Sequence, residues 1–356
     1  MNMSNLAKLL NEISLADSPR LEDLEQILNL NRQEELKELF SYADKIRQEF
    51  CGAGIFLRGI IEFSNYCCRE CFYCGLNKNN HKLTRYRMSK EELLESVAYL
   101  AAGNIKTLVL QSGEDEGLDV LWLKEIILSI KSQYDIAITL SLGERDAGDY
   151  RLWKEAGADR YLLKIESADE GLYLKTHSGM SFTRRLNCLT NLRSLGYQVG
   201  SGCIIGLPGQ TLKNIAQDIL FFKQNDFDMV GIGPFIAHKE TLFAQEQNGR
   251  LQLTLKALAL TRIVTKNAFL PATTALGSLD KDYRLEGLKC GANVLMPNFT
   301  PQPFRKLYEI YPGKRCVDEP VGACNFCMDK MAKSLGRFID YSRGDALKFK
   351  KAVLNV

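Results

Sequence analysis

The sequence has no long hydrophobic run and no excess of charge of one sign. Its apolar segments, such as 107–113 and 202–209, are of strand length, whereas a membrane-spanning helix needs about 20 apolar residues. Basic and acidic residues nearly balance, at 46 and 43, for a net charge of +3. We therefore expect neither a membrane nor a nucleic acid as a partner.

Histidine is scarce, and a secretory signal is not recognisable. The three histidines, His81, His177 and His238, are too scattered to predict a site. The first 30 residues place leucines at helical spacing among acids and amides, without the apolar core of a signal peptide, which predicts a cytoplasmic protein. In a reducing compartment, the 11 cysteines are expected to be metal ligands or buried small hydrophobes rather than disulfides.

Eight short β-rich segments alternate with helical segments. Helical patterning lies between them, as at 89–103, where Ser89 can cap a helix that Gly103 ends. This alternation predicts an α/β fold, a (β/α)8 TIM-type barrel whose functional residues lie at the carboxyl ends of the strands. The expected strands are 54–64, 107–113, 137–143, 160–167, 198–206, 228–235, 270–275 and 293–297.

Three regions are expected along the chain. Residues 1–53 form an N-terminal helical extension, with helices over 21–30 and 32–50. Residues 54–300 form the barrel, because no repeat or low-complexity linker interrupts its pattern. Residues 301–356 form a C-terminal wrapping segment.

Four cysteines lie within eight residues directly after the first expected strand. Cys67, Cys71 and Cys74 form the pattern C-x3-C-x2-C, and Cys68 between them is expected to point elsewhere. Three neighbouring thiolates can bind three corners of a 4Fe–4S cluster and leave the fourth iron open to a ligand. Zinc is the alternative, although a structural zinc site needs four ligands and this loop offers three.

This loop resembles the signature of the radical S-adenosylmethionine (SAM) enzymes, with the aromatic Tyr73 before the last cysteine. Several motifs between residues 63 and 330, among them "KTLVLQSGEDEG", "GLPGQT" and "IYPGK", together resemble one branch, the HydE maturases of FeFe-hydrogenase, which is related to biotin synthase and methylornithine synthase. The resemblance implies a 4Fe–4S cluster and SAM, which together yield methionine and a 5′-deoxyadenosyl radical. It implies no catalytic side chain beyond these cofactors.

The resemblance also assigns SAM contacts to strand ends. Gln111, Ser112 and Gly113 match a contact to the SAM amino group, and a carboxylate such as Glu166 suits ribose hydroxyls. The Arg185 guanidinium suits the SAM carboxylate, whereas Arg184 is expected at the surface. The whole expected set is Tyr73, Gln111, Ser112, Gly113, Ser141, Glu166, Arg185, Met229 and Tyr308.

Several positions keep two interpretations. Glu114 either adds charge to the amino-group contact or favours a helix N-terminus. Met229 either touches adenine or packs in the core. Lys164 stands where the family often has arginine, and lysine cannot make the same forked contact.

Two further groups of residues follow from the resemblance. Thr273, Thr274 and Met296 match the lining of a substrate cavity for anionic, sulfur-bearing ligands, although threonines also simply pack in strands. The tail cysteines match an accessory iron–sulfur site, 2Fe–2S or 4Fe–4S, with zinc or no metal as alternatives. They are Cys316, Cys324 and Cys327.

The expected function is FeFe-hydrogenase maturation, in which a cysteine-derived iron–carbonyl–cyanide precursor is processed for the di-iron subcluster of the H-cluster. The expected partners are other hydrogenase maturation proteins and an electron donor. Biotin synthase uses barrel cysteines, and segments 107–113 and 137–143 contain none. The alternatives are a methylornithine-synthase-like radical SAM mutase and a non-catalytic iron–sulfur carrier, which would not need the polar residues at the barrel mouth.

Overall fold

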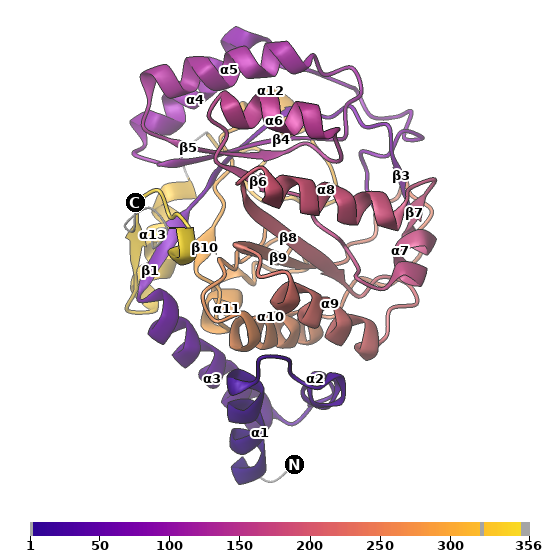
Figure 1. Ribbon diagram of the computed structural model, residues 1–356, viewed down its shortest axis with the longest axis vertical. Helices are drawn as coiled ribbons and strands as arrows, with labels where there is room; N and C mark the ends of the chain where they lie inside the picture. Colours follow the sequence, from indigo (N-terminus) through magenta and orange to yellow (C-terminus); the bar gives the residue numbers. More distant parts are fainter. Residues whose placement is uncertain (1–2, 321–323, 350–356) are drawn as a thin grey trace.

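Six parallel strands form the main sheet of this protein. The computed structural model describes residues 3–320 and 324–349 (Figure 1). The strands, in spatial order, are β2 (Gly59–Ser64), β4 (Thr107–Ser112), β5 (Ala137–Ser141), β6 (Arg160–Leu162), β8 (Gln198–Ile205) and β9 (Met229–Pro234). They are buried almost throughout, as expected when helices cover the outer face.

Helices follow the strands in the order that the sequence predicts. Ser89 caps the first of them through a capping box with Glu92. The helices around the sheet are α4 (Lys90–Ala102), α5 (Val120–Gln133), α6 (Ala147–Glu155), α7 (Glu170–Thr176), α8 (Phe182–Ser194), α9 (Leu212–Gln224), α10 (Leu251–Thr265) and α11 (Arg284–Lys289).

Single bridges close the barrel between β9 and β2. Residue Phe269 bridges Met229, Pro271 bridges Val294, and Asn298 bridges Ile60, all in parallel. The strand predicted over 270–275 is therefore reduced to one bridge, and that over 293–297 to β10 (Val294–Leu295). Proline has no amide hydrogen for a ladder, which explains why pairing is interrupted here.

Two other predicted strands also differ in extent. The segment 54–64 divides at residue 58 into β1 (Gly54–Leu57) and β2, and these belong to different sheets. The segment 160–167 pairs as a strand over 160–162 and again only at Glu166, which forms a single parallel bridge with Cys203 and has a φ of +61°.

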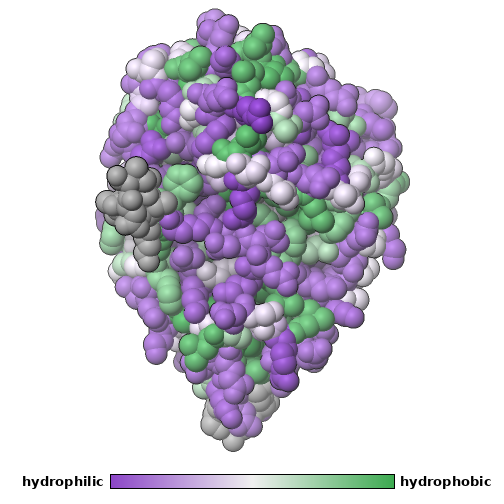
Figure 2. Space-filling view, in the orientation of Figure 1, coloured by the Kyte–Doolittle hydropathy of each residue, from purple (hydrophilic) through white to green (hydrophobic). Residues whose placement is uncertain are grey.

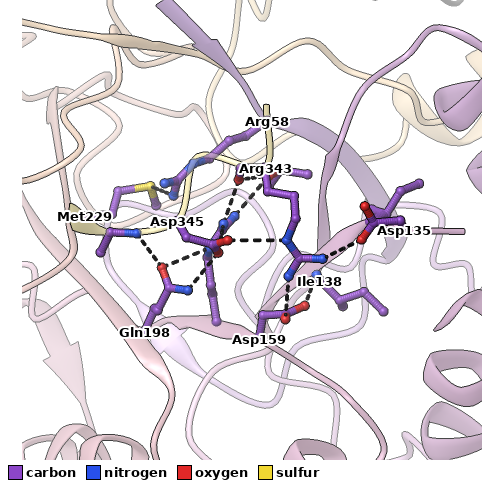
Figure 3. A network of polar contacts seen from close by, with 12 residues as sticks. Arg58, Asp135, Ile138, Asp159, Gln198, Met229, Arg343 and Asp345 are labelled. Carbon is purple, nitrogen blue, oxygen red and sulfur yellow. Dashed lines mark hydrogen bonds and ion pairs between the residues drawn. The ribbon is translucent and has the colours of Figure 1, made fainter. Parts of the chain in front are cut away.

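The described part of the tail extends from the cysteine loop, where the Ile310 carbonyl accepts a bond from the Gly75 amide, to the amino-terminal end of the barrel. It contains α12 (Gln302–Arg305), α13 (Cys324–Ser334) and β11 (Phe338–Asp340), which pairs in parallel with β1. Figure 3 shows Asp345 between Arg343 and Gln198. The Asp345 carboxylate accepts bonds from Arg160 at 2.6 Å and Gln198 at 2.9 Å, which are the first residues of β6 and β8. The last described residues of the tail thus cover the end of the barrel opposite the cysteine loop.

Three N-terminal helices pack outside the barrel, at the bottom of Figure 1. They are α1 (Met3–Leu15), α2 (Leu21–Leu28) and α3 (Gln33–Cys51), which contact α9 and α10. The predicted helices over 21–30 and 32–50 correspond to α2 and α3. Within the described residues, the helices are too short or too polar to cross a membrane. Figure 2 shows that hydrophilic residues cover most of one face, with small apolar groups between them.

Candidate active site

One cavity of about 350 Å³ lies at the carboxyl ends of the barrel strands. The three loop cysteines line it, and so does every residue expected from the sequence to contact SAM or substrate. The structure therefore brings together side chains spread over more than 240 positions of the chain. These are Cys67, Cys71, Cys74, Tyr73, Gln111, Ser112, Gly113, Ser141, Glu166, Arg185, Met229, Thr273, Thr274, Met296 and Tyr308.

The cysteine loop is fastened to the barrel by backbone bonds. The short strands β3 (Glu70–Cys71) and β7 (His177–Ser178) pair antiparallel, with Cys71 opposite His177. Farther along the loop, the Gly75 amide donates to the Ile310 carbonyl at 2.9 Å. Segments distant in the sequence therefore hold the loop at the mouth of the barrel.

Burial makes the three thiols poor acids in the absence of iron. It raises the pKa of all three, to about 12 for Cys74. Iron binds the thiolate form, so a bound cluster would offset this cost. In the described residues, no three His, Cys, Asp or Glu side chains converge on a single-ion site. In a 4Fe–4S cube each cysteine binds a different iron, so three thiols around one cavity fit that group.

Gly113 provides room between the end of β4 and the cysteine loop. A Cβ at this position would lie 2.2 Å from the Tyr66 carbonyl oxygen and 2.8 Å from the Cys67 Cβ. One neighbour is a backbone oxygen and the other is a Cβ attached directly to the backbone, so neither can move without a shift of the chain. The absence of a side chain at Gly113 is therefore required for the loop to approach the strand end.

Two buried carboxylates, Glu114 and Glu144, form a charged network with arginines. Arg69 Nε donates to Glu114 Oε1 at 2.6 Å, and Arg185 Nε donates to Glu144 Oε1 at 2.8 Å. The Glu144 amide donates to Glu114 Oε2 at 3.0 Å, which links the two pairs. Helix α5 begins only at Val120, so Glu114 does not occupy a helix N-terminus. Sequence reasoning missed Arg69 and Glu144, although Glu144 follows a predicted strand end.

The adjacent arginines of α8 differ in environment. The Arg185 side chain is 8% exposed, lines the cavity, and donates to the Lys164 carbonyl through Nη1. The Arg184 side chain is 53% exposed and reaches Glu144 Oε2 at 3.3 Å and Asp146 at 3.2 Å. Arg184 therefore lies at the surface, yet it shares the Glu144 carboxylate.

His177 lines the cavity, although the sequence predicted no histidine site. Its Nε2 lies 2.8 Å from the Tyr73 hydroxyl, and its Nδ1 lies 2.9 Å from the Tyr173 carbonyl oxygen. Burial lowers the pKa of His177 to about 3, so the ring is neutral. Nδ1 then carries the proton that is donated to the carbonyl, and Nε2 accepts from Tyr73. The contact between Tyr73 and His177 joins residues 104 positions apart, which the pairing of β3 with β7 brings together.

Lys164 and Glu166, two residues apart in the segment that follows β6, form an ion pair. Lys164 Nζ lies 3.1 Å from Glu166 Oε2. The lysine stem passes over two glycines, because a Cβ at Gly202 would lie 2.8 Å from Lys164 Cε, and one at Gly231 would lie 3.7 Å away. The position that departs from the family pattern is thus a cavity residue with a carboxylate partner.

A second ion pair, Glu62 with Lys314, also lines the cavity, and the sequence did not predict it. Both side chains are at most 6% exposed, and Asn298 Nδ2 donates to Glu62 Oε2 at 3.0 Å. Burial lowers the pKa of Lys314, while the Glu62 carboxylate opposes that shift. The substrate-cavity candidates Thr273, Thr274 and Met296 belong to the same lining.

The lower boundary of the cavity is formed in part by Met229. Its side chain is 3% exposed, packs with Phe269, and accepts a contact from Arg58 Nη1 at 2.6 Å, as Figure 3 shows. Met229 is thus both a core residue and a cavity residue, so the two interpretations from the sequence do not exclude each other.

Of the tail cysteines, Cys316 and Cys327 do not belong to the cavity lining. Cys316 is half-buried and Cys327 is exposed. The side chain of Cys324 lies outside the described part of the chain, so the structure gives no geometry for the three together.

A parallel α/β barrel with a three-cysteine loop at its mouth defines a radical SAM enzyme, and comparison with known proteins agrees. The model of the radical SAM superfamily matches residues 61–222. The chain is 48% identical over 316 residues to the FeFe hydrogenase maturase subunit HydE of Thermotoga maritima, covering 89% of this chain and 90% of that protein. It therefore belongs to the HydE family of radical SAM enzymes. Membership implies a 4Fe–4S cluster and SAM.

More distant relatives share the fold. The chain is 29% identical over 292 residues to 3-methylornithine synthase of Methanosarcina acetivorans, covering 81% of each. The crystal structure of methylornithine synthase (PylB) aligns with a TM-score of 0.80 at 24% identity, over 93% of this chain and 97% of that one. The structure of HydG aligns with a TM-score of 0.82 at 17% identity, over 96% and 77%. The predicted barrel architecture is confirmed.

Proposed function

We propose that this chain acts in FeFe-hydrogenase maturation, with a 4Fe–4S cluster on Cys67, Cys71 and Cys74 and SAM bound beside it. The observation that supports this most is that these thiols and all the expected SAM contacts face one cavity, in a chain 48% identical to a HydE protein. When bound, the reduced cluster supplies the electron that cleaves SAM to methionine and a 5′-deoxyadenosyl radical.

The protein's own residues bind and orient SAM in this proposal. Arg185 pairs with the SAM carboxylate, and Glu144 holds the other side of its guanidinium at 2.8 Å. Gln111 and Ser112 supply polar groups for the amino group, and Glu166 accepts the ribose hydroxyls. Because these side chains are largely shielded from water, their charges act more strongly on the ligand than they would in solvent.

The substrate in this proposal is a small anionic, sulfur-bearing molecule, the cysteine-derived iron–carbonyl–cyanide precursor of the di-iron subcluster. Hydroxyl groups of Thr273 and Thr274 and the ammonium group of Lys314 provide donors for an anion in the same cavity. The product would pass to other hydrogenase maturation proteins in the cytoplasm, and a separate protein would donate the electron. We propose that the tail cysteines carry the accessory cluster.

The test uses anaerobically reconstituted protein, with reductive formation of 5′-deoxyadenosine as the readout. Replacing any one of Cys67, Cys71 and Cys74 with alanine should abolish that product and lower the iron content, whereas Cys68→Ala should retain both. Unchanged 5′-deoxyadenosine in the three alanine variants would contradict the cluster assignment. Addition of the wild-type protein should restore maturation of FeFe-hydrogenase in a reaction that lacks HydE. Formation of 3-methylornithine without maturation would favour the mutase, and failure to bind SAM would favour the carrier.

A further inference from the structure

The backbone of Glu166 has a conformation that a residue with a side chain rarely adopts. Its φ is +61°, in the left-handed region, and its side chain lies in the cavity. Such strained residues occur where the surroundings hold them, and they are concentrated at functional sites. The surrounding contacts should therefore show what keeps Glu166 in place.

One side of Glu166 is held by the neighbouring strand β8. The Glu166 amide donates to the Gly202 carbonyl at 3.0 Å, and the Ile204 amide donates to the Glu166 carbonyl at 3.2 Å. Glu166 also forms an isolated parallel bridge with Cys203. These bonds fix the residue itself, but they do not determine the direction in which the chain leaves it.

The other side is held by Asp218, which comes from the middle of α9. Asp218 Oδ1 accepts a hydrogen bond from the Ala168 amide at 2.5 Å. Asp218 has no exposed surface, and Ser167 and Cys203 lie beside its carboxyl group, although its Oδ2 forms no hydrogen bond of normal geometry in the described part of the chain. Burial raises the pKa of this carboxyl well above its usual value. Burying a carboxyl group with no cation beside it costs free energy of folding, so we expect a local role of Asp218.

We propose that Asp218 is a positioning residue for Glu166. By holding the Ala168 amide two residues further along, it fixes the turn that directs the Glu166 carboxylate into the cavity. Asp218 itself is packed behind that turn and contacts no ligand. The proposal rests on the proposed role of Glu166 as the acceptor for the SAM ribose hydroxyls.

Two substitutions separate this role from general stabilisation. Asp218→Asn keeps an oxygen that accepts from the Ala168 amide, whereas Asp218→Ala removes it. Asp218→Asn should therefore bind SAM like the wild type. Asp218→Ala should weaken SAM binding by about tenfold, as expected when a contact to one charged group is lost. Equilibrium SAM binding to reconstituted, anaerobic protein is the assay, with thermal melting recorded in parallel.

A double-mutant cycle with Glu166→Ala provides the decisive measurement. If Asp218 acts through Glu166, then Asp218→Ala should cause no further loss of SAM affinity in the Glu166→Ala background. An equal loss in both backgrounds would show a structural role only and would overturn the proposal. Normal SAM binding by Asp218→Ala, with Glu166→Ala impaired, would overturn it as well.

The remaining outcomes are also informative. Normal SAM binding by Glu166→Ala would refute the ribose contact in the proposed function, and the positioning role would fall with it. If Asp218→Ala does not fold, Asp218→Asn provides the test. This variant keeps the oxygen that accepts from the Ala168 amide, so impaired SAM binding by folded Asp218→Asn would contradict the proposal.

Discussion

Arg185→Ala should weaken SAM binding substantially. In the structure, Arg185 Nε bonds to Glu144 and Nη1 bonds to the Lys164 carbonyl, while Nη2 has no hydrogen bond within the described part of the chain. That nitrogen is the donor available to a ligand carboxylate. Losing a charge-assisted bond in this buried site costs about 1.5–3 kcal/mol, or roughly ten- to a hundredfold in affinity.

The same change should also lower stability, which the experiment has to separate from binding. Without Arg185, the buried Glu144 carboxylate retains, among the described residues, Arg184 at 3.3 Å and Arg69 at 3.5 Å. We expect a destabilisation of about 1–3 kcal/mol from the lost partner. SAM affinity should therefore be measured by calorimetry well below the melting temperature of each variant, with circular dichroism to confirm folding.

Two matched variants complete this experiment. Arg185→Lys should recover only part of the affinity, because an ammonium keeps the charge and loses the forked geometry. Arg184→Ala should bind SAM normally, because its side chain is 53% exposed and does not line the cavity. Impaired binding by Arg184→Ala together with normal binding by Arg185→Ala would refute the assignment of Arg185.

Two further predictions concern the tail. Although burial opposes it, the bonds from Gln198 and Arg160 hold the pKa of Asp345 at about 2, so its stabilising effect should be lost as the pH falls from about 3.8 towards 2. At pH 7, Asp345→Asn should lower the free energy of unfolding in urea by about 1–2 kcal/mol. The control Asp135→Asn, whose side chain is 77% exposed, should change it by less than about 0.5 kcal/mol. Equal effects would contradict a stabilising role of Asp345 at the amino-terminal end of the barrel. Replacing Cys316, Cys324 and Cys327 together should lower the iron content and leave SAM cleavage intact. Loss of SAM cleavage in a folded triple variant would contradict their accessory role.

Local patterns in the sequence determined the class of fold and the candidate cofactor loop. The spacing of Cys67, Cys71 and Cys74 is a property of eight neighbouring residues, so it is visible without a structure. The barrel prediction rests on alternating strand and helix patterns, and parallel strands place their carboxyl ends at one mouth. For this reason Gln111 and Ser141, at the ends of β4 and β5, could be assigned to the cavity in advance.

Contacts between distant segments could be decided only by the tertiary structure. Glu62 and Lys314 are 252 positions apart in the sequence, and Arg185 and Glu144 are 41 positions apart, so no local sequence pattern predicts either ion pair. His177 lines the cavity where β7 pairs with the cysteine loop. The segment predicted as a strand over 160–167 pairs only at 160–162 and again at Glu166, whose φ is positive. A sequence specifies which side chains are available, but burial and partner geometry, which set their charge and direction, exist only once the chain has folded.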